Sequence, residues 1–142
     1  MKRLISIAML AVLLCSVALA QDETAKKKEA QSAAESWLAL VDAGKYAQSW
    51  DEAASFFKAA VTKENWEKMV SAARDPLGAK GSRNLVSAQY TTTLPGAPKG
   101  EYIVITYATN FASMPSAIET ITPMLDKDGR WRVSGYFIKP AQ

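Results

Sequence analysis

The chain has 142 residues, 49% of them hydrophobic, with a formal net charge of +3, one cysteine and no histidine. This composition excludes an internal disulfide, a Cys/His zinc site and a catalytic triad that depends on imidazole. The length is sufficient for one domain and rarely for two. Any function must therefore come from a single small domain without imidazole chemistry and without a disulfide.

The first 20 residues are organised as an export signal. Residues 2–3 are basic, residues 4–14 are almost entirely apolar, and residues 18–20 form a small-x-small cleavage site. The apolar run is short for a bilayer span. We therefore expect cleavage before Gln21, and a periplasmic or secreted bacterial protein that keeps no membrane segment.

The only cysteine, Cys15, lies within this leader. Lipid attachment requires a small residue before the cysteine, and Leu14 stands there, so cleavage at residues 18–20 is the favoured interpretation.

Loss of Lys2 and Arg3 leaves 15 basic residues against 14 acidic ones, a net charge of +1. A nearly neutral domain lacks the basic surface that nucleic acid or an anionic membrane requires. We expect neither as a partner.

Helical patterns fill the first part of the mature chain. After a polar lead-in over residues 21–29, the apolar residues from Ala30 to Val41 recur at helical spacing, and Gly44 is placed to end that helix. Ser49 and Glu52 have the spacing of a capping box. They predict a second helix whose inward stripe runs from Trp50 to Val61.

A third helix is expected from Thr62, as its cap, to the segment before Pro76. The pattern then changes to four β-branched and aromatic runs with turn residues between them, RNLVSAQYTTTL, EYIVITYATNF, AIETITPML and RWRVSGYFI. Such short connections favour antiparallel pairing. The predicted fold over residues 30–140 is α+β, with three N-terminal helices packed on one face of a four-stranded antiparallel meander sheet.

The last strand combines aromatic and basic residues behind the turn signal Asp128-Gly129. Alternation in a strand predicts that Trp131, Val133 and Phe137 face inward and that the arginines on either side of Trp131 face solvent. Pro123 and Gly135 are expected to mark bulges. The mixed composition is thus explained as a hairpin without any ligand.

The stretch AESWLALVDAGKYAQSWDEAASFFKAAVTKENWEKMVSAARDPLG, followed by GRWRVSGYFIKP, resembles the bacterial family known as domain of unknown function 4019. The resemblance rests on Trp37, Trp50, Phe57, Trp66, the Pro76-Leu77-Gly78 turn and the Gly129-Arg130-Trp131 to Gly135-Tyr136 segment. It implies an export signal before a single small domain, and it implies no activity. More loosely, the order of helices and sheet is similar to cystatin-like and nuclear-transport-factor-like cone folds, which is an analogy of fold alone.

No catalytic motif, metal-ligand cluster or cofactor-binding loop is evident, so we predict no catalytic residue, no metal and no cofactor. Asp126 and Asp128 are spaced like the start of a calcium loop, but no bidentate acid follows at the required distance. The candidate ligand-binding residues are Trp50, Tyr90, Tyr107 and Glu119. Each is also compatible with ordinary packing.

Three functions compete. The first is an exported, non-catalytic module that binds a protein or a small molecule. The second is a small-molecule enzyme that uses a buried carboxylate, for which Glu119 is the acid inside a predicted strand, together with a tyrosine. The third is a self-associating structural protein or homodimer, because the strand YIVITYATNF is apolar on both of its faces.

Overall fold

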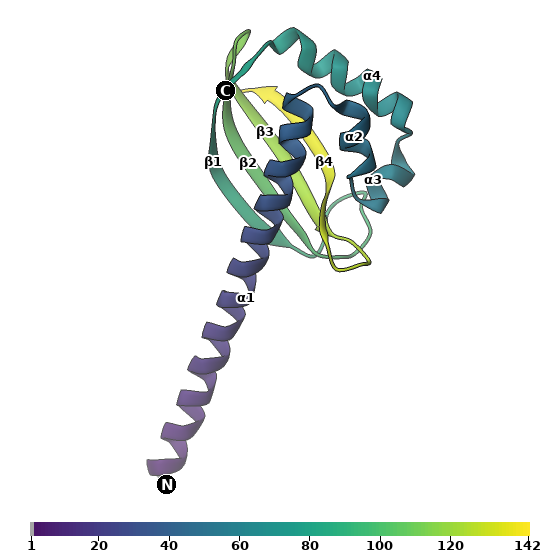
Figure 1. Cartoon of the computed structure of the whole chain (residues 1–142). Helices are drawn as coiled ribbons and strands as arrows, with labels where there is room; N and C mark the ends of the chain where they lie inside the picture. The colour runs from purple at the N-terminus through teal and green to yellow at the C-terminus, as the bar shows by residue number, and fades with distance from the viewer. Residues whose placement is uncertain (1) are drawn as a thin grey trace.

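In the computed structural model the chain forms an α+β fold, with helices followed by a four-stranded sheet (Figure 1). The structure describes the backbone of residues 2–142 and the side chains of residues 18–142. Most of the expected export signal, Cys15 included, therefore lies outside the described side chains. The elements are α1 Lys2–Asp42, α2 Tyr46–Asp51, α3 Ser55–Ala60, α4 Lys63–Arg74, a 3₁₀ turn Asp75–Leu77, β1 Lys80–Thr91, β2 Tyr102–Phe111, β3 Met114–Leu125 and β4 Trp131–Pro140.

Helix α1 crosses one face of the sheet, and its N-terminal part extends beyond the domain (Figure 1). Residues 18–25 are exposed, whereas Ala30 is the first residue with a described side chain that is fully buried. Within the described residues, no helix combines the length and the apolar character that crossing a membrane requires. The predicted end of the helix is confirmed, because Gly44 has φ 70° and the Lys45 amide donates to the Leu40 carbonyl at 2.9 Å.

The single helix predicted after residue 49 is wrong, because the chain forms two short helices there, and the described residues hold four α-helices rather than three. Residues 52–54 separate α2 from α3, and the Ala54 amide donates to the Val133 carbonyl of β4 at 2.8 Å. This tertiary hydrogen bond takes the place of the helical one. Ser49 is not a cap either, since it lies inside α2 and its hydroxyl donates to the Tyr46 carbonyl at 2.7 Å.

The predicted boundaries of the last helix are confirmed. The Asn65 amide donates to the Thr62 hydroxyl at 3.3 Å, which satisfies one free amide at the start of α4. At the other end, α4 stops at Arg74 and the 3₁₀ turn contains Pro76. The helix therefore begins and ends where local sequence chemistry dictates.

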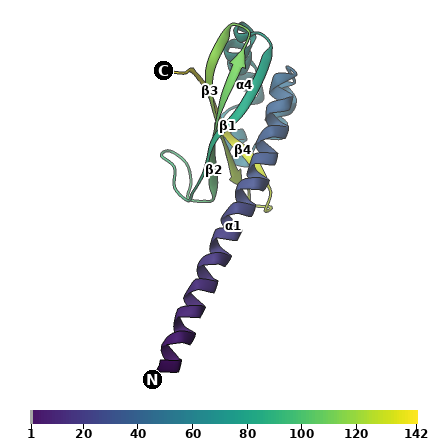
Figure 2. The ribbon, with the colours of Figure 1, turned by 90° about the vertical axis from the view of Figure 1, so that its left-hand side faces the viewer.

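The sheet is the predicted antiparallel meander with strand order β1-β2-β3-β4. The helices pack on one face, and the loop over residues 92–100 lies on the other side (Figure 2). The main core lies between helices and sheet, where Trp37 and Trp66 meet Ile105, Ile121 and Val133. On the opposite face of β2, Val104, Thr106 and Ala108 are half-buried, and homodimer formation through this face stays a prediction.

The β3–β4 hairpin turns as expected at Asp128-Gly129, and Gly129 has the positive φ of 80° that such a turn requires. Trp131 and Val133 face the core. The prediction for Phe137 is wrong, because its side chain is 72% exposed. The reason is a bulge in β4: Pro123 pairs with Val133 and Thr122 pairs with Gly135, so β4 has one extra residue at this point. After the bulge, each side chain of β4 lies on the face opposite to the one that strict alternation predicts.

Candidate functional site

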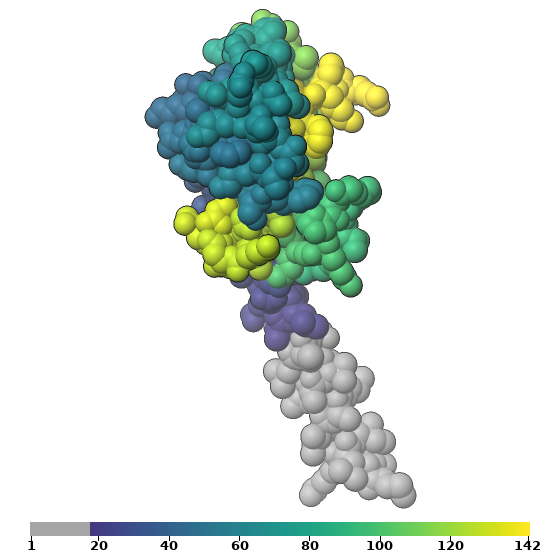
Figure 3. All heavy atoms as spheres, turned by 90° about the vertical axis from the view of Figure 1, so that its right-hand side faces the viewer, coloured from purple at the N-terminus to yellow at the C-terminus, as the bar shows by residue number. Residues whose placement is uncertain are grey.

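A groove of about 780 Å³ opens between α1, the end of α2 and the β3–β4 hairpin. Its walls are residues 29–37 of α1 on one side, Asp51 and Glu52 on the second, and residues 129–133 on the third. Figure 3 shows the hairpin, in yellow-green, directly below the blue helices that follow α1. The buried indoles of Trp37 and Trp131 lie at the base of the groove. The groove is therefore a hollow with a rigid aromatic base.

The hairpin wall is held in place by its acidic turn. The Asp126 carboxylate accepts hydrogen bonds from the Ser55 amide at 2.9 Å and the Ser55 hydroxyl at 2.6 Å, and so caps the start of α3. Burial alone would raise the pKa of Asp126, but these hydrogen bonds and the nearby Arg132 keep it below its usual value. Asp128 forms two hydrogen bonds of 2.7 Å with the Arg132 guanidinium. The two carboxylates thus hold the turn, Asp126 to α3 and Asp128 to β4.

This acidic turn gives a testable pH dependence. The Arg132 guanidinium holds the pKa of Asp128 at about 2, so the ionised form stabilises the folded state above the ordinary aspartate pKa of about 4. That stabilisation is lost as the pH falls towards 2. We expect Asp128→Asn to lower the melting temperature near neutral pH and the difference from wild type to shrink at about pH 2.

A matched variant distinguishes this ion pair from a general effect of the turn. In Asp128→Asn the new amide side chain would still offer an oxygen to the Arg130 amide, which donates to Asp128 at 3.2 Å, so the turn itself is preserved. In an Arg132→Met background, Asp128→Asn should have a much smaller effect on the melting temperature. Equal effects in both backgrounds, or a difference that persists at low pH, would contradict the pairing.

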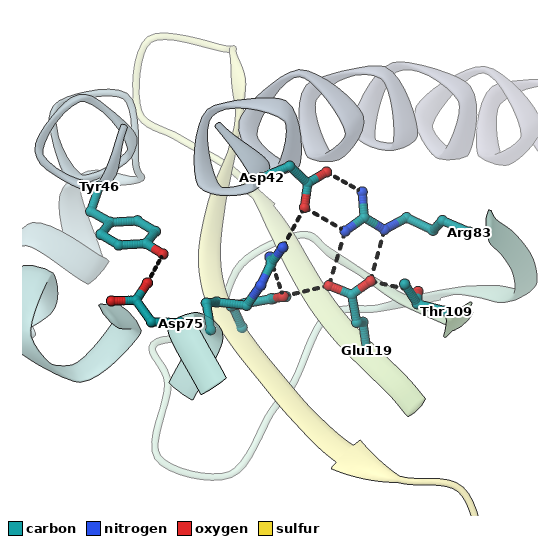
Figure 4. Close-up of polar contacts among 8 residues, drawn as sticks. Asp42, Tyr46, Asp75, Arg83, Thr109 and Glu119 are labelled. Carbon is teal, nitrogen blue, oxygen red and sulfur yellow. Dashed lines mark hydrogen bonds and ion pairs between the residues drawn. The ribbon is translucent and has the colours of Figure 1, made fainter. Parts of the chain in front are cut away.

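A second polar centre lies inside the domain, where six side chains from both long helices and all four strands meet (Figure 4). Its charged members are two acids and two arginines, so the centre is formally neutral. The members are Asp42 at the end of α1, Arg74 at the end of α4, Arg83 on β1, Thr109 on β2, Glu119 on β3 and Tyr136 on β4. We call this set the buried network.

Glu119 is at the middle of the buried network and is completely buried. One carboxylate oxygen accepts from Arg83 Nε at 2.7 Å and from the Thr109 hydroxyl at 2.5 Å. The other accepts from Arg83 Nη2 at 3.1 Å and from the Tyr136 hydroxyl. Each oxygen thus has two donors, which uses the hydrogen-bonding capacity of an ionised carboxylate.

Asp42 links the two arginines. It accepts from Arg83 Nη1 at 2.7 Å and from Arg74 Nη2 at 2.7 Å. Burial alone would raise the pKa of Asp42, but the two guanidinium groups lower it below its usual range. Burial and the adjacent Glu119 raise the pKa of Tyr136, so its hydroxyl stays a proton donor. The charges of the buried network therefore cancel, and its hydrogen bonds join α1 and α4 to all four strands.

The four candidate residues from the sequence are in three separate places. Glu119 belongs to the buried network, and its register partner across β2 and β3 is Tyr107. The Tyr107 hydroxyl points to Glu35 at 3.4 Å, and burial with this carboxylate raises the pKa of Tyr107 to about 12. Only this pair of candidates is brought together, and neither residue lines the groove.

The other two candidates make surface contacts with lysines. Trp50 donates its indole N–H to the Val61 carbonyl at 2.8 Å, and the ammonium of Lys63 lies 5.3 Å from its ring centre. Tyr90 donates to Glu101 at 2.9 Å, and Glu101 also binds Lys26 at 2.6 Å. The second arrangement fastens α1 to the edge of the sheet. In the part of the chain with described side chains, no cluster of three or more acidic residues is placed to hold a metal ion.

The groove residues were missed because their helices and hairpin are far apart in the sequence. Trp131 and the arginines beside it were explained as a hairpin, which they are, yet the same residues form one wall of the groove. The fold and the groove define a class of small α+β domain with an open polar hollow beside an edge strand. The chain belongs to the family described as Protein of unknown function (DUF4019), whose sequence model matches residues 33–136. No curated protein matches the sequence.

Proposed function

We propose that the protein is an exported, non-catalytic binding module whose ligand, a protein segment or a small molecule, occupies the groove. The observation that carries this proposal is that the groove and the buried network are separate, because no member of the buried network lines the groove. A general acid or base must lie within hydrogen-bond reach of its substrate. The groove instead offers serine, carboxylate and arginine side chains over an aromatic base, which suits recognition.

The alternative enzyme with a buried carboxylate and a tyrosine receives less support. Glu119 and Tyr136 do form a carboxylate–tyrosine pair. However, Arg83 neutralises the carboxylate, and a general base needs a free lone pair to accept a proton. The pair is therefore better suited to holding β3 and β4 together than to proton transfer.

Export is the second part of the proposal, with cleavage after Ala20 and a periplasmic or secreted location. Residues 18–20 are exposed, and among the described side chains of α1 the first ion pair to the rest of the domain joins Lys26 to Glu101, the residue before β2. Removal of the leader would therefore leave the core and its anchoring ion pair intact. Signal peptidase also requires an accessible small-x-small segment, and this one lies outside the packed domain.

Site-specific photo-crosslinking in intact cells tests the proposal. A photoreactive amino acid at Ser32 would line the groove, whereas the same group at Ala39 would lie on the same helix, exposed and outside the groove. We expect a discrete adduct from position 32 and none from position 39, in protein whose mass shows that it begins at Gln21. Equal adducts from both positions, no adduct from either, or an uncleaved leader would contradict the proposal.

A further inference from the structure

The edge strand β4 leaves backbone groups without partners at the base of the groove. In an antiparallel pair, residues alternate between those whose N–H and C=O face the partner strand and those whose groups face away. The Arg130 carbonyl accepts from the Asp126 amide at 2.9 Å, so Arg130 faces β3. The backbone N–H and C=O groups of Trp131 and Val133 therefore face the free edge. The hydrogen bond from the Ala54 amide to the Val133 carbonyl agrees with this orientation.

Only one of these outward groups is used by the protein. Outside the β3–β4 ladder, no described backbone group donates to the Trp131 carbonyl, and the outward amides of Trp131 and Val133 meet no backbone acceptor. All three groups belong to residues that line the groove. An unpaired strand edge is a template for another strand, and a groove beside it gives space for the side chains of that strand.

The charges on the walls of the groove indicate which side chains would suit a strand that pairs with this edge. Asp51 is paired with Lys63 at 2.5 Å, and Arg132 is paired with Asp128. Glu29 and Glu52 form no ion pair with any described residue, and they face a single uncompensated cation, Arg130. The groove therefore offers more negative than positive charge to a ligand, and it complements a lysine or arginine side chain.

We propose that the groove binds an extended, basic segment of another protein, which adds to the free edge of β4 by pairing with Trp131 and with the Val133 amide. The inference rests on the proposed binding function and names its ligand class. Pairing would stop at the Val133 carbonyl, because Ala54 already occupies it. The added strand is therefore short, and the carboxylates of Glu29 and Glu52 hold its basic side chain.

The test uses the purified exported protein and a displayed library of random linear peptides. Peptides are selected on the wild type and counter-selected on Ser36→Trp, which fills the groove from an exposed position of α1. We expect the retained peptides to be rich in lysine or arginine. Failure to retain any peptide, or retention of acidic or uncharged ones only, would overturn the inference.

The retained peptide is then examined by amide exchange and by charge substitution. Its binding should slow exchange of the Trp131 and Val133 amides by at least about tenfold, which corresponds to about 1.4 kcal/mol of added protection. Glu52→Gln should weaken binding several-fold, while Glu64→Gln, an exposed acid on α4 outside the groove, should not. Unchanged exchange at both amides would overturn strand addition.

The outcome can be separated from that of the proposed function. An adduct from position 32 in cells, together with unprotected Trp131 and Val133 amides in the peptide complex, would show a working groove that does not use the strand edge. Absence of the adduct would contradict the binding function itself, whatever the peptides do.

Discussion

Replacing Arg83 with methionine should lower the free energy of unfolding by about 3–5 kcal/mol, the usual cost of removing one partner from a buried ion pair. Arg83 is the only residue among those described that binds both acids of the buried network. Without it, the fully buried Glu119 keeps only the hydroxyls of Thr109 and Tyr136. Urea unfolding followed by tryptophan fluorescence measures the change.

A double variant separates the loss of the ion pair from the loss of packing. Glu119→Gln removes the negative charge and keeps one oxygen, which can accept from Thr109 or from Tyr136, while an amide NH2 takes the place of the other carboxylate oxygen. Combined with Arg83→Met, it should cost less than the sum of the two single changes, by about 1–3 kcal/mol, because the uncompensated charge is gone. Additive costs, or an Arg83→Met variant within about 1 kcal/mol of wild type, would show that the buried network is not the structural centre described above.

Replacing Trp37 with alanine should lower the free energy of unfolding by a similar amount, about 3–5 kcal/mol, because it empties a large volume in the core. Trp37 is 3% exposed and packs against Trp66 and Tyr136, with ring centres 5.6 and 5.5 Å away. Its indole N–H also donates to the Ser49 carbonyl at 2.7 Å. Thermal or urea unfolding checks the value.

Two further variants make this result interpretable if Trp37→Ala does not fold. Trp37→Phe keeps most of the volume and loses the donor to Ser49, so it should cost about 1–3 kcal/mol. Met69→Ala on α4, where the side chain is 62% exposed, should stay within about 0.5 kcal/mol of wild type. A cost for Trp37→Phe as small as that of Met69→Ala would contradict the buried hydrogen bond.

Local sequence patterns were sufficient for most of the fold. The cap at Thr62, the turn at Gly44 and the hairpin at Asp128-Gly129 each depend on chemistry within a few residues, and all three are confirmed. The break between α2 and α3 was not predictable in this way. It depends on the Ala54 amide reaching the Val133 carbonyl, a contact across more than half of the chain.

Phe137 shows a second limit of local patterns. Strict alternation from Trp131 places residue 137 inward, and the prediction failed because an extra residue in β4 changes the alternation after Val133. Gly135 was a usable signal for that irregularity, but a glycine does not specify which later side chains change face. Knowledge of the pairing with Thr122 and Pro123 was needed.

The two polar centres were the least predictable features. Asp42, Arg74 and Arg83 each look like ordinary solvated charges in the sequence, and only the packing of α1 and α4 against the sheet buries them together. Glu119 was singled out because it stands inside an apolar strand, which is a real signal of burial but does not reveal its partners. The groove likewise exists only where α1, α2 and the hairpin meet.

The most direct test of the account is the photo-crosslinked adduct from position 32, measured in cells that carry a groove-filling substitution. Ser36→Trp places an indole in the groove, and Ala39→Trp places the same indole on the same helix outside it. If the groove holds the ligand, Ser36→Trp abolishes the adduct and Ala39→Trp leaves it at the level of the unsubstituted protein. An adduct that survives Ser36→Trp, in a protein of unchanged stability, would contradict the groove as the functional site.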